Sequence, residues 1–455
     1  LMGTVPRPAL TGNNMVNSDY SHGSGNCKNC YFVFWSYFSE DSQYGHALLF
    51  SRITFDSIIT DNSDHVYEAL HGNRLYRARF AYFADECLDA SFLYDCVGCS
   101  YCFGCINRRK QKYQLFNQQL SKEEYIAQIA YWDLGSYART EEAKKKFKEL
   151  YYSLPRRYAH VLNSVNVSGD IIRDTKNCIM CFSTFDGVED CKFMYIGGLN
   201  LKDSYDVSGG GVTSTLLYET MATSSSHSCR FTAGTQDSLD CEYSDWLNNC
   251  SNVFGSITLR NKKYCILNKQ YSPEGYKSLV AKIRNHMNEM PYIDKKGREY
   301  RYGEFFASEL AAYAYNESLA FTWYPKTKEE VAAEGWQWRD RPERTYKISV
   351  EAKDLPDHIR DATDSMLKET IGCLHGGMCN EQCTGAFRLT AEELAFYRDM
   401  HIALPRLCPN CRYVERFGWR NLYHLYSRPC MCEGGASYTT DKAVEYKNTD
   451  EHFHG

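Results

Sequence analysis

The chain has 455 residues and a formal net charge of −5. Its length exceeds one ordinary core and predicts two to four domains. No stretch approaches the roughly 18 consecutive apolar residues that a membrane-spanning helix needs, so we expect no membrane partner. The acidic balance excludes a polycation that binds nucleic acid over its whole surface.

The N-terminal segment, residues 1–26, shows no basic region followed by an apolar one, so we expect no signal peptide there. Because the sequence opens on Leu1 rather than Met, we expect that a further segment precedes it.

The first 285 residues contain an internal duplication. Residues 99–129 align without a gap with residues 250–280, at an offset of 250 − 99 = 151. The identical pairs at this offset include Phe103/Phe254, Gly104/Gly255, Arg109/Arg260, Tyr113/Tyr264, Asn117/Asn268, Gln119/Gln270, Ser121/Ser272 and Tyr125/Tyr276. Chance is a poor explanation for such a series, so the chain contains two copies of one unit.

Each copy begins with short aromatic and β-branched runs between turn-forming residues, as in residues 48–60 and 190–198. Such runs predict strands, and their recurrence at roughly 10–20 residues without a helical period predicts the stacked coils of a β-solenoid. We expect one β-solenoid-like (β-helix) unit over residues 1–120 and a second over residues 171–271. Cys, Ser, Asn and aromatic side chains should form ladders along the coils.

Helix signals follow each unit. Ser121 with Glu124 predicts a capping box, and Ser272 followed by Pro273 predicts a second helix start. A helix at this place would cover the open edge of the last coil. The further segments expected are a helix at residues 141–154, a helical connector over 121–170, a helix and aromatic-rich linker subdomain over 272–353, and a helix from Asp354 to about Ile371.

The C-terminal part carries two close cysteine pairs, Cys379-x3-Cys383 and Cys408-Pro-Asn-Cys411. Two such turns facing each other supply the four thiolates of a tetrahedral zinc site. Between the pairs the sequence predicts a short strand and a helix capped by Thr390. We therefore expect a zinc-ribbon module over residues 354–455, and an α+β multidomain protein as a whole. A catalytic zinc keeps an open position and a nearby base, which this pattern lacks, so the zinc is predicted to be structural.

A further pair, Cys430 and Cys432, calls for two more ligands. His452 and His454 are candidates, but partners beyond Gly455 or a solvated histidine tail explain the sequence equally well. The remaining candidates near the first site are Cys373 and His375.

The 21 cysteines include an odd one, so they cannot all pair within one chain. Close pairs are typical of metal ligands and favour a reducing, cytoplasmic location. The three-residue steps of Cys96, Cys99, Cys102 and Cys105 fit neither disulfides nor metal ligands.

The stretch GAFRLTAEELAFYRDMHIALPRLCPNCRYVERFGWRN, with the later CMC, resembles the zinc-ribbon module of a group of Cys/Tyr-rich repeat proteins common in candidate-phylum bacteria. The resemblance extends over nearly the whole chain, including LRNKKYCILNKQYSPEGY and the block YGEFFASELAAYAYNESLAFTWYPKTKEEVAAEGWQWRD. It implies zinc binding and no particular activity. Members of the group continue past the HFHG position to another Cys pair, so the chain is expected to extend there.

Three functions compete. We favour a non-catalytic zinc-binding scaffold or assembly protein that contacts other proteins, or copies of itself, through the solenoid surface. The alternative is a protein that binds RNA or single-stranded DNA through basic residues interleaved with aromatics. The same residues could instead form a solvated, partly packed face of the ribbon. These residues are Arg406, Arg412, Arg416, Arg420 and Arg428.

The third function is a carbohydrate-active β-helix enzyme, which rests on analogy of fold alone. Its candidate carboxylates are Asp203, Asp206, Asp237 and Asp240. The Gly-rich stretch 207–215 lacks the Gly-Lys-Ser/Thr of a phosphate loop and is better explained as a solenoid loop.

Overall fold

The computed structural model describes residues 1, 3–6, 10–341 and 346–425. The chain divides into two compact units. Of the described residues, the first-solenoid unit comprises 10–156, 340–341 and 346–420, and the second-solenoid unit comprises 1, 3–6, 157–339 and 421–425. The five segments expected from the sequence are thus grouped into two units, and most of the cysteine-rich C-terminal part belongs with the first solenoid.

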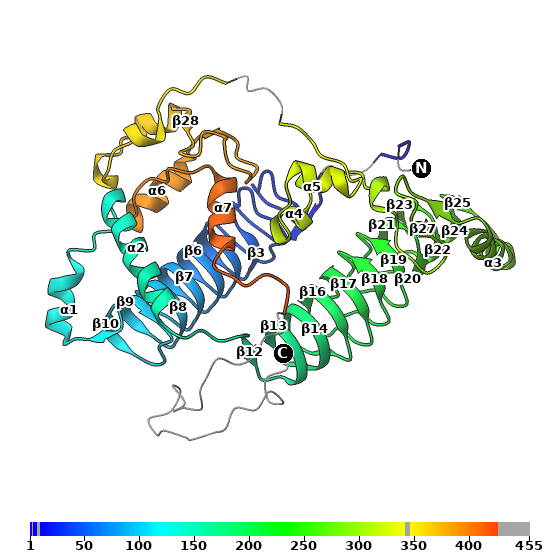
Figure 1. Ribbon diagram of the computed structural model, residues 1–455, viewed down its shortest axis with the longest axis horizontal. Coiled ribbons are helices and arrows are strands. Elements are labelled where there is room, and N and C mark those ends of the chain that lie inside the picture. Colours follow the sequence, from blue (N-terminus) through cyan, green and yellow to red (C-terminus); the bar gives the residue numbers. More distant parts are fainter. Residues whose placement is uncertain (2, 7–9, 342–345, 426–455) are drawn as a thin grey trace. The chain divides into compact units, whose positions relative to one another are not determined.

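The first solenoid is a stack of parallel coils, as predicted (Figure 1). Its strands are β1 (Gly12–Asn13), β2 (Ser24–Gly25), β3 (His46–Leu49), β4 (Arg52–Phe55), β5 (Ile58–Asp61), β6 (Asp64–Asn73), β7 (Tyr76–Asp85), β8 (Ser91–Val97), β9 (Ser100–Ile106), β10 (Lys112–Leu115) and β11 (Gln118–Gln119). Val66 pairs with Ala78, and Arg79 pairs with Ser91. Each coil therefore takes twelve residues, and the period is more regular than the sequence suggested.

Every third side chain points into the tube. One continuous cluster contains Val66, Ala69, Leu75, Ala78, Ala81, Ala84, Cys87, Ala90, Leu93, Cys96, Cys99, Cys102 and Cys105. A twelve-residue coil with one inward residue in three has four short sides, so the interior admits mostly small side chains. This geometry explains the three-residue cysteine steps, since a thiol here is one of several small groups that fit.

The residue before each inward position adopts the left-handed conformation, as at Phe80 (φ 53°) and Phe92 (φ 56°). This conformation costs energy for residues other than glycine. Each such residue gains contacts between coils in return. The Phe38 N–H donates to the carbonyl of Gly25 at 3.1 Å, and the rings of Phe80 and Phe92 stack at 4.4 Å.

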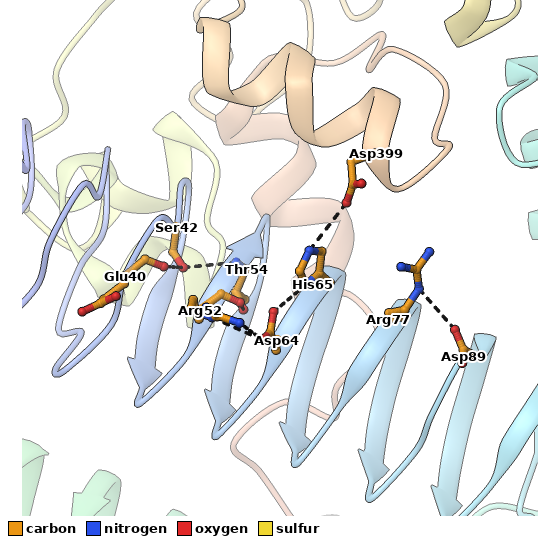
Figure 2. A network of polar contacts seen from close by, with 9 residues as sticks. All are labelled: Glu40, Ser42, Arg52, Thr54, Asp64, His65, Arg77, Asp89 and Asp399. Carbon is orange, nitrogen blue, oxygen red and sulfur yellow. Dashed lines mark hydrogen bonds and ion pairs between the residues drawn. The ribbon is translucent and has the colours of Figure 1, made fainter.

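Polar side chains one coil apart pair along the outside of the tube. Arg52 forms an ion pair with Asp64 at 2.6 Å, and Arg77 forms one with Asp89 at 3.3 Å. Figure 2 shows both pairs. The Asn29 amide likewise donates to Asp41 at 2.8 Å. Complementary residues at a spacing of twelve thus add to the register that the backbone sets, although each exposed pair contributes little by itself.

The second solenoid follows the same plan (Figure 1). Its strands are β12 (Val161–Leu162), β13 (Val165–Arg173), β14 (Thr175–Phe185), β15 (Val188–Glu189), β16 (Lys192–Gly198), β17 (Tyr205–Gly210), β18 (Tyr218–Met221), β19 (Arg230–Ala233), β20 (Leu239–Glu242), β21 (Asp245–Asn248), β22 (Ser251–Phe254), β23 (Ile257–Arg260), β24 (Lys263–Ile266) and β25 (Lys269–Gln270). Some early coils take thirteen residues (Lys192 pairs with Tyr205) and later ones take twelve (Tyr218 pairs with Arg230).

The Gly-rich stretch 207–215 lies in this solenoid, as its sequence indicated. Glycine is required in the preceding coil at Gly197, which pairs with Gly210 and where an added Cβ would lie 2.0 Å from the carbonyl oxygen of Gly210. The backbones of successive coils approach too closely there for any side chain.

Each solenoid ends in the same way. The last strand turns back in an antiparallel hairpin, β10–β11 or β24–β25. At the turn, the side chains of Asn117 and Asn268 accept hydrogen bonds from the N–H groups of Ile106 (2.9 Å) and Ile257 (2.8 Å). The two asparagines are a matched pair of the duplication, and the hairpins close the edges of the stacks.

The predicted helix starts are confirmed. Helix α1 (Lys122–Ile129) begins at Ser121 with the Glu124 capping box, and α3 (Pro273–Glu289) begins at Ser272. Helix α2 (Tyr137–Ser153) packs on β8 and β9. The other elements of the second-solenoid unit are β26 (Tyr292–Ile293), β27 (Glu299–Tyr300), η1 (Ser308–Leu310), η2 (Tyr315–Glu317), α4 (Leu319–Trp323) and α5 (Lys328–Ala333).

Residues 346–420 fold onto the first solenoid with short elements. These are η3 (Ala352–Asp354), η4 (Ile359–Asp361), η5 (Asp364–Lys368), β28 (Ile371–Gly372), β29 (Ala386–Phe387), α6 (Ala391–Asp399) and α7 (Pro409–Phe417). The helix predicted from Asp354 to about Ile371 is wrong. The side chain of Asp357 instead binds Ser136 at the start of α2, at 2.6 Å, and this contact holds the segment in an irregular path. Among the described residues, no helix is long and apolar enough to cross a membrane.

Candidate metal centre

Helices α6 and α7 position the cysteine-rich segment beside the solenoid (Figure 1). Helix α6 begins at Thr390, as predicted, and this residue also donates to the side chain of Gln43 at 2.9 Å. The ring of Phe396 on α6 stacks on Phe55 at 4.0 Å. Helix α7 packs on β6. The segment therefore shares a core with the first solenoid and is no separate ribbon.

An ion network lies at the centre of this contact. The Asp56 carboxylate lies 3.0 Å from both Arg412 and Arg416, and Arg412 also pairs with Glu393 at 3.0 Å. All four side chains are at most 3% exposed. Burial disfavours the charge of Arg412, but Asp56 and its neighbours hold the pKa of that arginine well above its usual range. Each buried charge thus has an opposite charge at ion-pair distance, although neither Asp56 oxygen makes a hydrogen bond to a described residue.

Four of the five arginines predicted as nucleic-acid contacts are buried. Arg412 and Arg416 face carboxylates inside the protein and cannot offer their guanidinium groups to phosphate as they stand. Arg406 donates to the carbonyls of Leu355 and Pro356, and Arg420 lies over the ring of Phe417 at 3.5 Å. Both are at most 8% exposed. Arg428 lies outside the described residues.

Four buried cysteines converge beside α7: Cys373, Cys383, Cys408 and Cys411. The sulfur of Cys373 lies 3.9 Å from that of Cys411, Cys383 lies 3.9 Å from Cys408, and Cys408 lies 3.5 Å from Cys411. A tetrahedral zinc ion with bonds of about 2.3 Å places its sulfurs about 3.8 Å apart. The cluster therefore has the ligand type and the spacing that zinc requires.

The surroundings of Cys408 favour its thiolate form, whereas burial raises the pKa of Cys383 and the hydrogen bond with Cys373 raises the pKa of Cys411. Cys408 caps the N-terminus of α7, where the helix dipole stabilises negative charge. Hydrogen bonds from Cys373 and then Cys411 lower the pKa of Cys408 well below its usual range. Backbone N–H groups point at two of the sulfurs, from Gly385 to Cys383 at 3.2 Å and from Cys408 to Cys373 at 3.3 Å.

The structure differs from the sequence prediction at one ligand. Cys383, Cys408 and Cys411 come together as expected, but the fourth buried sulfur belongs to Cys373. Strand β28 pairs with β29, so the Cys373 N–H donates to Gly385 at 2.9 Å and the side chain lies near Cys383. Cys379 lies at the edge, 3.7 Å from the sulfur of Cys411. The other predicted ligands, Cys430, Cys432, His452 and His454, lie outside the described residues.

The solenoid cysteines form hydrogen bonds within and between the coils. Their thiols donate to backbone carbonyls of the same and the next coil, as from Cys96 to Tyr94 (3.5 Å) and to Cys105 (3.3 Å). Inward serines make the same bond, as from Ser51 to Leu49 at 3.1 Å. Within the described residues all cysteines are free of disulfides. Their inward positions therefore reflect size and hydrogen bonding.

A third polar group joins Asp133, His358 and His401. Both histidines reach the carboxylate, at 3.0 Å and 2.8 Å. The Nδ1 atom of His358 accepts a hydrogen bond from the N–H of Arg360. Its Nε2 therefore carries the hydrogen and donates it in a hydrogen bond to Asp133. That nitrogen therefore has no lone pair for a metal. The group links the turn before α2 to the C-terminal segment by hydrogen bonds.

The predicted carboxylates do not converge on each other. Asp203 and Asp206 occupy successive left-handed positions, and so do Asp237 and Asp240. Residues three apart lie on adjacent sides of a four-sided coil, so the members of each couple point in different directions. This arrangement gives no support to paired-carboxylate chemistry.

No family model matches the chain, and no match was found among the curated proteins. One solved structure that aligns with it comes from Desulfovibrio desulfuricans G20, and its protein is provisionally described as an acetyltransferase. The two share 10% identity over 63% of this chain and 85% of that one, with a TM-score of 0.12. A likeness this weak carries no argument. The fold and site together define a β-solenoid repeat protein, rich in cysteine and aromatic residues, with a C-terminal four-cysteine cluster.

Proposed function

We propose that the protein is a non-catalytic scaffold in which a zinc ion, held by Cys373, Cys383, Cys408 and Cys411, fastens a ribbon-like segment to the first solenoid. The buried four-sulfur cluster with tetrahedral spacing carries this proposal. Four protein ligands leave no position for substrate or water, which is the arrangement of structural zinc.

Little regular secondary structure surrounds the cluster. Strands β28 and β29 have two residues each, and the loop between them contains no regular element. Metal binding is linked to folding where the ligands come from otherwise weak structure. Zinc would therefore stabilise the β28–β29 loop and the start of α7 together. Because Arg412 and Arg416 lie on α7, it would also stabilise the packing of this segment on the solenoid.

The solenoid supplies the surface for contacts with other proteins in this proposal. Phe38 and Phe50 stack at 5.0 Å on its outside and are 51% and 57% exposed. Exposed aromatic pairs are characteristic of surfaces that bind partners. The many free thiols accord with a reducing, cytoplasmic setting.

The first experiment measures zinc per chain in the purified full-length protein and in two matched variants. Cys383→Ser should bind less zinc than the wild type and unfold at a lower temperature. Cys265→Ser, at an inward solenoid position, should keep all its zinc. Equal zinc in all three proteins would contradict the metal assignment.

The second experiment tests the scaffold role by size-exclusion chromatography with light scattering. We expect self-association or a co-purifying protein that Phe38→Ser/Phe50→Ser weakens. A strict monomer without a partner would count against the proposal.

A further inference from the structure

The loop between β28 and β29 carries a second set of metal-ligating groups. His375, Cys379 and Glu381 gather against Cys411, and one ligand atom from each lies within 4.8 Å of all the others. The set combines nitrogen, sulfur and oxygen donors, a combination that suits zinc or cobalt. It is distinct from the four-sulfur cluster but touches it at Cys411.

The contact between His375 and Glu381 points to a ligand. The Nδ1 atom of His375 lies 3.1 Å from Oε2 of Glu381, and both atoms are screened from solvent. Neither atom has a hydrogen-bond partner among the described residues. The two atoms lie at ion-pair distance but make no hydrogen bond with each other. Buried polar atoms normally make one, so this approach calls for an explanation. A cation that accepts lone pairs from both atoms provides one.

The sulfur geometry agrees. Cys379 and Cys411 lie 3.7 Å apart, within the range of the sulfur separations inside the four-cysteine cluster. A thiolate retains lone pairs after it binds one metal ion, so the sulfur of Cys411 can bridge two ions.

The loop is held in place for this role. Arg341 donates to the carbonyls of Gly377 and Cys379, each at 2.6 Å, and Asn410 donates to Gln382 at 2.8 Å. These bonds fix both sides of the Cys379 turn and tie it to the first turn of α7. Ligands fixed before binding lose less entropy when the metal arrives.

We propose that His375, Cys379, Glu381 and Cys411 bind a second divalent ion, with the thiolate of Cys411 bridging it to the zinc of the four-cysteine cluster. This inference rests on the proposed function, because the bridge requires the first ion. The side chains of His375 and Glu381 are 35% and 29% exposed, whereas the four cysteines are buried, so this ion lies closer to solvent than the zinc. It should exchange and be chelated faster than the buried one.

The test titrates metal-free, reduced full-length protein with Co²⁺ and follows absorption, while native mass spectrometry counts bound ions. The first cobalt should give the spectrum of a four-thiolate site. A later equivalent should add the bands of a mixed nitrogen, oxygen and sulfur site. His375→Gln/Glu381→Gln should lose that equivalent alone, and the control His401→Ala should bind as the wild type does.

The outcomes separate the two proposals. If the His375/Glu381 variant binds as many ions as the wild type while Cys383→Ser binds fewer, the second site is refuted and the first stands. If neither variant loses an ion, the four-cysteine assignment fails as well. If Cys379→Ser removes the four-thiolate spectrum, Cys379 belongs to the first site and the bridged pair is wrong. The wild-type spectrum needs no variant, so a variant that fails to fold leaves the test intact.

Discussion

The buried network around Asp56 gives a quantitative prediction. Asp56→Asn removes the carboxylate charge that both Arg412 and Arg416 contact at 3.0 Å. Arg412 retains Glu393, but Arg416, whose side chain is 1% exposed, keeps no other ion pair among the described residues. A buried charge left without its partner costs about 3 to 5 kcal/mol. We expect a loss of that size in the free energy of unfolding of the first-solenoid unit.

Urea denaturation would measure the loss, with hydrogen exchange on β6 and α7 to assign the transition to this unit. Arg416→Met removes the other charge of the pair. The double variant Asp56→Asn/Arg416→Met should lose less free energy of unfolding than the two single variants lose in sum. The matched control is Glu86→Gln, which removes the partner of Arg74 on the exposed face and should cost less than about 1 kcal/mol. Equal losses for Asp56→Asn and Glu86→Gln, or strict additivity in the cycle, would refute the reasoning.

Three further predictions concern the same unit. Ala81→Leu overfills the tube, because Ala81 is fully buried in its column, and should destabilise by about 3 kcal/mol in a urea titration; a wild-type midpoint would contradict the narrow interior. Cys99→Ser replaces one small hydrogen-bonding group by another and should stay within about 1 kcal/mol of the wild type, whereas a large loss together with lost metal would show that Cys99 is a ligand. Burial raises the pKa of Glu68 from 4.5 to about 7. The folded protein therefore favours the neutral acid. Its contribution to the free energy of unfolding is fully present below pH 4.5, and about 3 kcal/mol of that free energy is lost as the pH rises through 7. Glu68→Gln should match the wild type at pH 4 and exceed it at pH 8, and parallel pH profiles would contradict this.

The duplication and the element types were readable from the sequence. The gapless match at an offset of 151 locates both copies, and Asn117 and Asn268 make the same turn contact in each. The helix starts at Ser121, Ser272 and Thr390 were predictable because an N-cap depends on local hydrogen bonds alone. The three-residue period was also present, in Cys96 to Cys105, but its meaning depends on a coil size that no local rule supplies.

The site was predictable only in part. Spacing identified Cys383, Cys408 and Cys411, since close pairs reflect the local turns that ligands need. Cys373 and the buried Asp56 network depend on contacts between segments far apart in the chain. Nothing in the local sequence separates an arginine that meets phosphate from one that meets Asp56.

The sequence by itself determined a duplicated β-solenoid with capped helices and a cysteine-rich C-terminal segment. The duplication follows from the match at an offset of 151. The other features follow from patterns within about a dozen residues, where backbone preference and hydrogen bonding decide. The tertiary structure alone decided which four sulfurs meet, that the segment packs on the first solenoid, and that four of its arginines are buried: Arg406, Arg412, Arg416 and Arg420. Each of these depends on which distant surfaces exclude water together, and that information is spread over the whole chain.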